Sequence, residues 1–182
     1  MELADKFQEG NPWPARDGQR VLFILDSRNG FERDLLKQWI HHHRTSASEE
    51  FEAPKVCLQL GDDRKTIDTA QLIIALALPA DTLVAPLRVA WLPSQEDIDS
   101  GPRLRNLFFG DPRHPGARRG RKIFETSPAR MRLIAGSPDS VANLRQRFEL
   151  HHNIEEGNAQ QDFAEFVGRQ AALVLDIAER RL

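Results

Sequence analysis

An alternation of short apolar runs with amphipathic segments limits what this chain can fold into more than any other feature. The run VLFILD, residues 21–26, is apolar up to its final aspartate, too short for a helix and rich in strand-forming side chains. A run of this kind is typical of an interior strand that is covered on both faces. We therefore expect residues 21–26 to form a buried strand.

The segment that follows this run has the features of a helix start. Asn29 can cap a helix, and Glu32 stands three residues later in the capping-box position. Apolar residues then recur at helical spacing: Phe31, Leu35, Trp39 and Ile40. The sequence therefore predicts a strand followed by a helix.

The same alternation recurs twice. KVCLQL, residues 55–60, predicts a second strand, and Asp63 or Thr66 can cap a second helix that runs up to Pro79. The expected apolar face of this helix consists of Ile67, Ala70, Ile74 and Ala77. TLVAPLRVAWLP, residues 82–93, predicts a third strand. Its Pro86 cannot donate to a strand ladder, which favours a sheet edge, a bulge or two shorter strands.

This order of elements predicts the fold class. We expect a three-layer α/β fold with a mostly parallel sheet of about four strands, flanked by helices and followed by a long C-terminal helix. The fourth strand is expected at residues 130–136, and Ser137 with Pro138 should begin a helix that buries Val141, Leu144 and Phe148. The last helix should begin at Asp162. Between residues 94 and 130 the pattern weakens: residues 94–102 and 110–120 read as loops, and residues 104–110 as a short helix.

The chain of 182 residues is the size of one domain. Residues 1–19 are turn-rich and read as a flexible tail, and residues 20–182 as a single α/β domain. The first 20 residues lack the apolar stretch of a secretory signal, and no apolar run approaches the roughly 20 residues of a membrane span, so we expect a cytoplasmic location. The last helix reaches Leu182 without a capping signal, which suggests a fragment of a longer protein.

Basic side chains concentrate in the middle of the sequence. Residues 101–132 contain nine arginines and lysines against two acidic residues, a local charge of +7, although the whole chain has a net charge of -2. This asymmetry indicates a surface for phosphate, nucleic acid or lipid headgroups. The candidate binding residues are Arg113, Arg118, Arg119, Arg121 and Lys122. The alternative is a solvated loop whose arginines pair with acidic neighbours.

Signatures of catalysis or of a cofactor are missing from the sequence. It has no phosphate-binding loop, dinucleotide fingerprint or G-x-S-x-G elbow, and its single cysteine, Cys57, cannot form an internal disulfide or a multi-thiolate metal site. We therefore expect no cofactor and no metal. Five histidines fall at the ends of predicted helices, where the helix dipole favours partly cationic side chains. They are the triplet His41 to His43 and the pair His151 and His152.

Two weaker candidates remain. His114 lies among arginines and prolines, where it either assists an anion site or is simply exposed. A small-molecule enzyme would use Asp26, Arg28 and Asp62, which follow predicted strands at the edge where α/β proteins bind ligands.

Several segments together resemble a known family. RVAWLP, GPRLRNLFFGDPRHPGARRGRKIF and RMRLIAGSPDSVANLRQRF resemble, in this order, the N-terminal region of actinobacterial glycerol-3-phosphate 1-O-acyltransferase. VLFILDSRNGFERDLLKQWI and DFAEFVGRQAALVLDIAERRL fit the same region before and after them, so the likeness spans residues 21–182. It implies a membrane-associated enzyme of phospholipid synthesis that transfers an acyl chain from acyl-CoA or acyl carrier protein to glycerol 3-phosphate.

The resemblance also implies a catalytic histidine with an aspartate five positions later. None of the six histidines has one; the residues found are Ser46, Ala47, Ser48, Arg119, Glu156 and Gly157. No family catalytic residue can therefore be placed in this chain. We expect a non-catalytic N-terminal domain whose partners are the C-terminal acyltransferase domain and an anionic membrane surface, with nucleic acid an unlikely partner. The alternative is a stand-alone phospholigand or nucleic-acid binding module that uses the basic segment 103–132.

Overall fold

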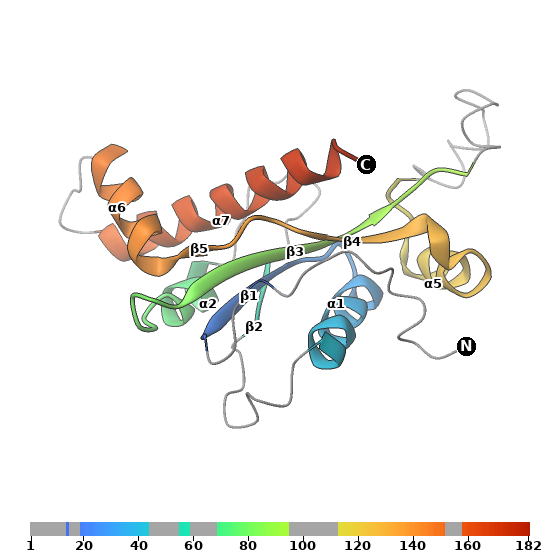
Figure 1. The fold of residues 1–182 in the computed structure, drawn as a ribbon, viewed down its shortest axis with the longest axis horizontal. Coiled ribbons are helices and arrows are strands. Elements are labelled where there is room, and N and C mark those ends of the chain that lie inside the picture. The colour runs from blue at the N-terminus through green and yellow to red at the C-terminus, as the bar shows by residue number, and fades with distance from the viewer. Residues whose placement is uncertain (1–13, 15–18, 44–54, 59–68, 95–112, 152–157) are drawn as a thin grey trace.

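A computed structural model of the chain describes residue 14 and residues 19–43, 55–58, 69–94, 113–151 and 158–182 (Figure 1). Its sheet has the strand order β2-β1-β3-β4, and a short strand β5 also pairs with β3. The strands are β1 (Val21–Asp26), β2 (Lys55–Leu58), β3 (Leu83–Trp91), β4 (Met131–Ala135) and β5 (Asp139–Ser140). The α/β fold class is confirmed. β1, β2, β3 and β4 lie where the sequence predicted the four strands.

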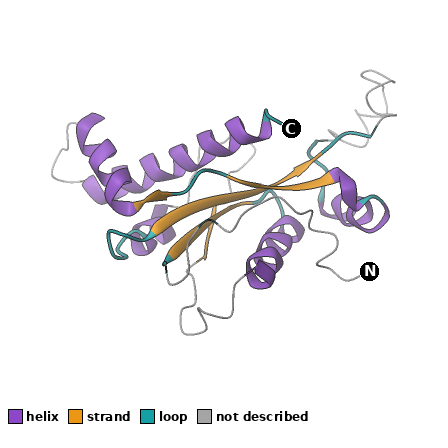
Figure 2. Ribbon diagram, in the orientation of Figure 1, coloured by secondary structure: helices purple, strands orange, loops and turns teal. Residues whose placement is uncertain are grey.

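The sheet is mixed in direction. β1 lies parallel to both β2 and β3, whereas β4 and β5 run antiparallel to β3. The chain re-enters the sheet at the end where β3 leaves it, since the Leu92 amide donates to the Arg130 carbonyl at 2.7 Å. A parallel β4 would require a crossover to the opposite end of the sheet. Figure 2 shows the long β3 at the centre of the sheet.

Helices cover both faces of the sheet (Figure 1). Val21, Phe23 and Leu25 of β1 face the core under α1 (Gly30–His43) and α5 (Ala117–Thr126). Leu22 and Ile24 face the opposite core, which α2 (Thr69–Ala75), α6 (Val141–His151) and α7 (Ala159–Glu179) cover. All six residues of β1 are buried, which confirms the prediction of an interior strand.

The predicted capping box starts α1. The Glu32 amide donates to Asn29 Oδ1 at 3.1 Å, and Glu32 Oε2 accepts a hydrogen bond from the Arg28 amide at 2.8 Å. In a capping box the carboxylate accepts from the amide of the N-cap residue, here Asn29. In this structure the Glu32 carboxylate accepts instead from the amide of Arg28, the residue before the cap. α1 then buries Leu35, Leu36, Trp39 and Ile40.

The prediction made from Pro86 is wrong, because β3 is one continuous strand with neighbours on both sides. The Pro86 carbonyl accepts a hydrogen bond from the Gly136 amide at 2.9 Å, so the nitrogen of Pro86 also points towards Gly136. Gly136 lies in the gap between β4 and β5. The missing N–H therefore falls where the neighbouring strand is itself interrupted, and β3 can remain intact.

The predicted apolar face of α2 and the predicted start of α6 also need correction. α2 buries Leu72 and Ala75, whereas Ile74 is 77% exposed, because an almost uniformly apolar segment does not specify which side faces the core. The predicted caps Asp63 and Thr66 lie outside the described residues. α6 begins at Val141 instead of Ser137, because β5 intervenes.

The remaining elements fit more closely. The Asn143 amide donates to Ser140 Oγ at 3.1 Å at the start of α6, and the expected face of Val141, Leu144 and Phe148 is buried. α7 begins three residues before Asp162, after Asn158 at its N-cap. A short 3-10 turn, η3 (Pro128–Arg130), leads into β4.

The predicted tail, residues 1–19, lies almost wholly outside the described residues and stays a prediction. Within the described ranges, no helix is both long and apolar enough to cross a bilayer.

Candidate anion-binding surface

The predicted basic loop contains a helix, α5. Gly116 precedes it in an extended conformation, and Gly120, Ile123 and Phe124 are buried at helical spacing. The loop prediction for residues 110–120 was therefore wrong for residues 117–120, and the short helix predicted at residues 104–110 lies outside the described residues. The burial of Ile123 and Phe124 against α1 and β3 stabilises the helix despite its repeated positive charges.

Close packing at Gly120 fixes α5 against the sheet. A Cβ atom at this position would lie 3.2 Å from Trp91 Cζ2 and 3.5 Å from Phe31 Cδ1. The 3.2 Å contact is tight and the 3.5 Å contact is ordinary, so the glycine lets the helix backbone approach the Trp91 ring closely. Phe31 also stacks on Trp91, with ring centroids 6.5 Å apart.

The packing of α5 determines which basic residues face solvent. Arg118, Arg121 and Lys122 are exposed, and the first turn of the helix has no acidic residue. Arg121 lies over the Phe31 ring, with its Cζ atom 5.5 Å from the ring centroid. We refer to Arg118, Arg121 and Lys122 as the α5 basic face. Four of the five predicted binding residues thus lie on α5, and three of these four are exposed.

The other two predicted residues differ in position. Arg113 is exposed but precedes α5, and Arg119 is only half-exposed on the helix. Both take part in further interactions of the fold. They therefore border the α5 basic face without belonging to it.

A second group of charged residues lies at the carboxyl end of β1. Arg88 of β3 is buried, and its Nε atom donates to Asp26 Oδ2 at 2.6 Å. Its Nη1 atom donates to Asp176 Oδ1 at 2.7 Å and to Glu179 Oε2 at 2.8 Å. One guanidinium thus joins two strands of the sheet to the end of α7.

These contacts change the protonation equilibria of the pair. Burial raises the pKa of Asp26 above its ordinary value, although attraction to Arg88 opposes the shift. Burial acts to lower the pKa of Arg88, but Asp26, Asp176 and Glu179 outweigh it and raise that pKa. Arg88 therefore stays cationic and is engaged on all sides by carboxylates. We assign this cluster to the stability of the fold.

On the opposite face of the sheet, Glu32 is 2% exposed. Its Oε1 atom accepts a hydrogen bond from Trp91 Nε1 at 2.9 Å, and its Oε2 atom bonds the Arg28 amide. The carboxylate thereby connects the start of α1 to β3. Neither Glu32 nor Arg88 was predicted to be a buried charge, although Arg88 is the only charged residue within the apolar run of β3.

Two of the histidines have hydrogen-bond partners in the fold. His43 Nδ1 donates to the Trp39 carbonyl at 3.0 Å, which supports the prediction that the histidines of α1 favour its C-terminal end. His114 is exposed and accepts a hydrogen bond at Nδ1 from Arg28 Nη1. Within the described ranges, no three histidine, cysteine or acidic side chains are grouped to hold a metal ion.

The small-molecule site predicted from Asp26, Arg28 and Asp62 stays a prediction, because only two of its three residues are described. Asp26 bonds Arg88, Arg28 points to His114, and Asp62 lies outside the described residues.

The chain matches no known protein family. It also matches no solved structure.

Proposed function

We propose that this chain is the non-catalytic N-terminal α/β domain of a glycerol-3-phosphate acyltransferase, and that the α5 basic face holds it against anionic lipid headgroups. The observation that carries this proposal is the grouping of Arg118, Arg121 and Lys122 on the exposed side of one helix. The ordered resemblance of five sequence segments to the N-terminal region of that family supports the identity of the parent enzyme.

The chemistry of acyl transfer favours a supporting role for this domain. An alcohol becomes a good nucleophile only when a base removes its proton during the attack. No histidine in the chain has the family's aspartate five residues later. Asp26 and Arg88, the buried ion pair nearest the strand ends, are bonded to each other. The complete enzyme would therefore carry out acylation with its C-terminal domain.

Electrostatics give the membrane contact its expected strength. A basic side chain near an anionic leaflet contributes about 1 kcal/mol, so the three residues of the α5 basic face would supply about 3 kcal/mol. The exposed residues of α5 include no large apolar side chain that could insert among acyl chains. Binding should therefore be peripheral and should weaken as salt screens the charges.

Vesicle flotation tests the membrane contact. The wild-type chain should float with phosphatidylglycerol vesicles at low salt and remain unbound with phosphatidylcholine vesicles. The variant Arg118→Gln/Arg121→Gln/Lys122→Gln should lose at least tenfold in affinity. Equal binding to both kinds of vesicle, or unchanged binding of this variant, would contradict the proposal.

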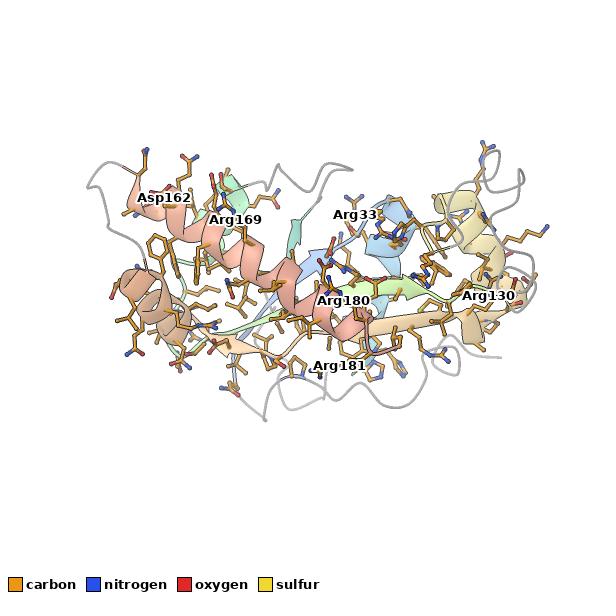
Figure 3. The ribbon with its side chains drawn as sticks, turned by 90° about the horizontal axis from the view of Figure 1, so that it is seen from above. Arg33, Arg130, Asp162, Arg169, Arg180 and Arg181 are labelled. Atoms are coloured by element: carbon orange, nitrogen blue, oxygen red, sulfur yellow. The ribbon has the colours of Figure 1, made fainter. Side chains whose placement is uncertain are left out.

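A charge-matched control is available on and after α7. Arg169 lies on α7, and Arg180 and Arg181 directly follow it (Figure 3). α7 packs on the core opposite the one that α5 covers. Changing all three to glutamine removes the same charge as the α5 variant. This control should keep wild-type vesicle binding, because its charges do not belong to the α5 basic face.

Identity of the parent enzyme needs a separate test. The coding sequence after the Leu182 codon should continue into a block containing His-x-x-x-x-Asp, and the purified chain should not acylate glycerol 3-phosphate. A stop codon at that point, or acylation by the chain alone, would refute the assignment.

The alternative of nucleic-acid binding would use the same charges. Phe124, the aromatic residue of α5, is 5% exposed and cannot stack on a base. Duplex DNA that displaced the chain from anionic vesicles, and bound more tightly than they do, would favour this alternative.

A further inference from the structure

We propose that Arg28, Arg33 and Arg121 form a binding site for a phosphomonoester group around the first turn of α1. This site does not depend on the acyltransferase assignment or on the membrane contact, because Arg28 and Arg33 lie outside the α5 basic face. Arg121 belongs to both. The three side chains come from the β1–α1 connection, from α1 and from α5.

Each arginine lies at this turn or contacts it. Arg28 is exposed directly before it, and its Nη1 atom donates to His114 Nδ1. The Arg33 side chain turns back, so that its Nη2 atom lies 3.7 Å from where a Cβ on Gly30 would be. Arg121 lies over Phe31, with 5.5 Å between its Cζ atom and the ring centroid. Two guanidinium groups, of Arg33 and Arg121, therefore lie against residues 30 and 31, and Arg28 carries a third just before them.

The positive charge of the group is not neutralised within it. Arg28, Arg33 and Arg121 form no salt bridge with any described residue. The nearby carboxylates of Asp26 and Glu32 are buried and have other donors: Asp26 bonds Arg88 although it also attracts Arg28, and Glu32 bonds Trp91 Nε1.

Two described neighbours also affect the charge at this turn. Asp34 is an exposed acidic residue on α1, next to Arg33 in sequence. His114 must accept at Nδ1, because arginine can only donate, so Nε2 carries the ring proton. Even with Asp34 counted, the exposed side chains at this turn keep an excess of positive charge.

The charge and donor chemistry of three arginines favour a phosphomonoester over simpler anions. Each guanidinium presents paired N–H donors that match two oxygens of a phosphate group. A phosphomonoester offers three terminal oxygens, each able to accept more than one hydrogen bond, and a charge close to -2. Stacking on Phe31 leaves the N–H edges of Arg121 available. The ligand could be a soluble phosphomonoester or the headgroup of a lipid such as phosphatidic acid.

Thermal unfolding in inorganic phosphate tests the site. At about pH 8, phosphate should raise the melting temperature of the wild-type chain saturably, compared with chloride at equal ionic strength. Arg28→Gln/Arg33→Gln should bind phosphate at least tenfold more weakly. Arg118→Gln/Lys122→Gln, which removes the same charge from the α5 basic face, should respond like the wild type. Both pairs are on the surface, and far-UV circular dichroism would verify their folding.

An NMR titration gives an independent measurement. The backbone amide signals of Gly30 and Phe31 should shift saturably with phosphate in the wild type and not in Arg28→Gln/Arg33→Gln. A melting temperature that rises equally in chloride, or a variant that binds phosphate as tightly as the wild type, would overturn the proposal.

Vesicles distinguish the two ligand sources. Binding to phosphatidic acid vesicles that is lost in Arg28→Gln/Arg33→Gln and reversed by inorganic phosphate would support a lipid phosphomonoester. Phosphate binding with no preference for phosphatidic acid over phosphatidylglycerol would support a soluble one. Loss of vesicle binding only in the α5 variant would refute a lipid ligand for this site and leave the membrane proposal intact.

Discussion

Arg88 donates from Nε to Asp26 Oδ2 across 2.6 Å, although 62 positions separate the two residues in sequence. Both side chains are 7% exposed. The same guanidinium bonds Asp176 and Glu179 near the end of α7. This one side chain therefore connects β1, β3 and α7. We expect a single substitution of Arg88 to lower the stability of the fold strongly.

Replacing Arg88 with methionine should destabilise the protein by about 3–5 kcal/mol, because Asp26 would remain buried without its partner. Urea denaturation at neutral pH measures the change. The double variant Arg88→Met/Asp26→Asn should recover part of the loss, since it removes both buried charges. A single variant within about 0.5 kcal/mol of wild type would show that the cluster does not stabilise the fold.

The raised pKa of Asp26 predicts how stability depends on pH. In the folded state Asp26 holds its proton to a higher pH than the ordinary value of 3.8. Its contribution to the free energy of unfolding is therefore fully present below the unfolded pKa and is lost as pH rises through the folded pKa. The loss of unfolding free energy caused by Asp26→Asn should accordingly be larger at about pH 3 than at about pH 7. A cost that grows with pH would instead indicate a lowered pKa.

Gly136→Ala should destabilise the protein by about 1–3 kcal/mol through overpacking. The added Cβ would lie 2.7 Å from Pro86 Cγ and 2.7 Å from Val174 Cγ2. Gly30→Ala is the matched control, because its Cβ would meet Arg33 Nη2 at an ordinary 3.7 Å. Thermal unfolding should separate the two variants clearly. Equal melting temperatures would mean that α7 does not approach the sheet this closely.

Glu32→Leu should cost about 2–4 kcal/mol, because the Trp91 indole N–H and the Arg28 amide would lose their acceptor. Asp34→Leu provides a control, since Asp34 is exposed two residues away and its loss should change stability by less than about 0.5 kcal/mol. Denaturant unfolding followed by tryptophan fluorescence measures both variants. Similar stability of the two would contradict the buried role of Glu32.

Local signals in the sequence were sufficient for several elements. The continuous apolar run of β1, the capping pair of Asn29 and Glu32, and the spacing of Val141, Leu144 and Phe148 all predicted what the structure shows. These predictions succeeded because each depends on residues close together in the chain, where periodicity and capping chemistry act directly.

The candidate anion-binding surface was only partly predictable. The charge excess of residues 101–132 indicated a basic surface, but glycine and proline hid the helix that displays Arg118, Arg121 and Lys122. The inclusion of Arg28 and Arg33 in a second site needed the packing of α5 beside α1, which no local pattern records.

The sequence by itself determined the α/β class, the covered strand β1 and the basic character of one segment, because hydrophobic periodicity and charge are properties of short stretches. Only the tertiary structure decided that β4 runs antiparallel, that Pro86 lies in a central strand and that Arg88 is shared by three carboxylates. These features arise from contacts between distant residues, where the partner's position decides whether a missing donor or a buried charge can be tolerated.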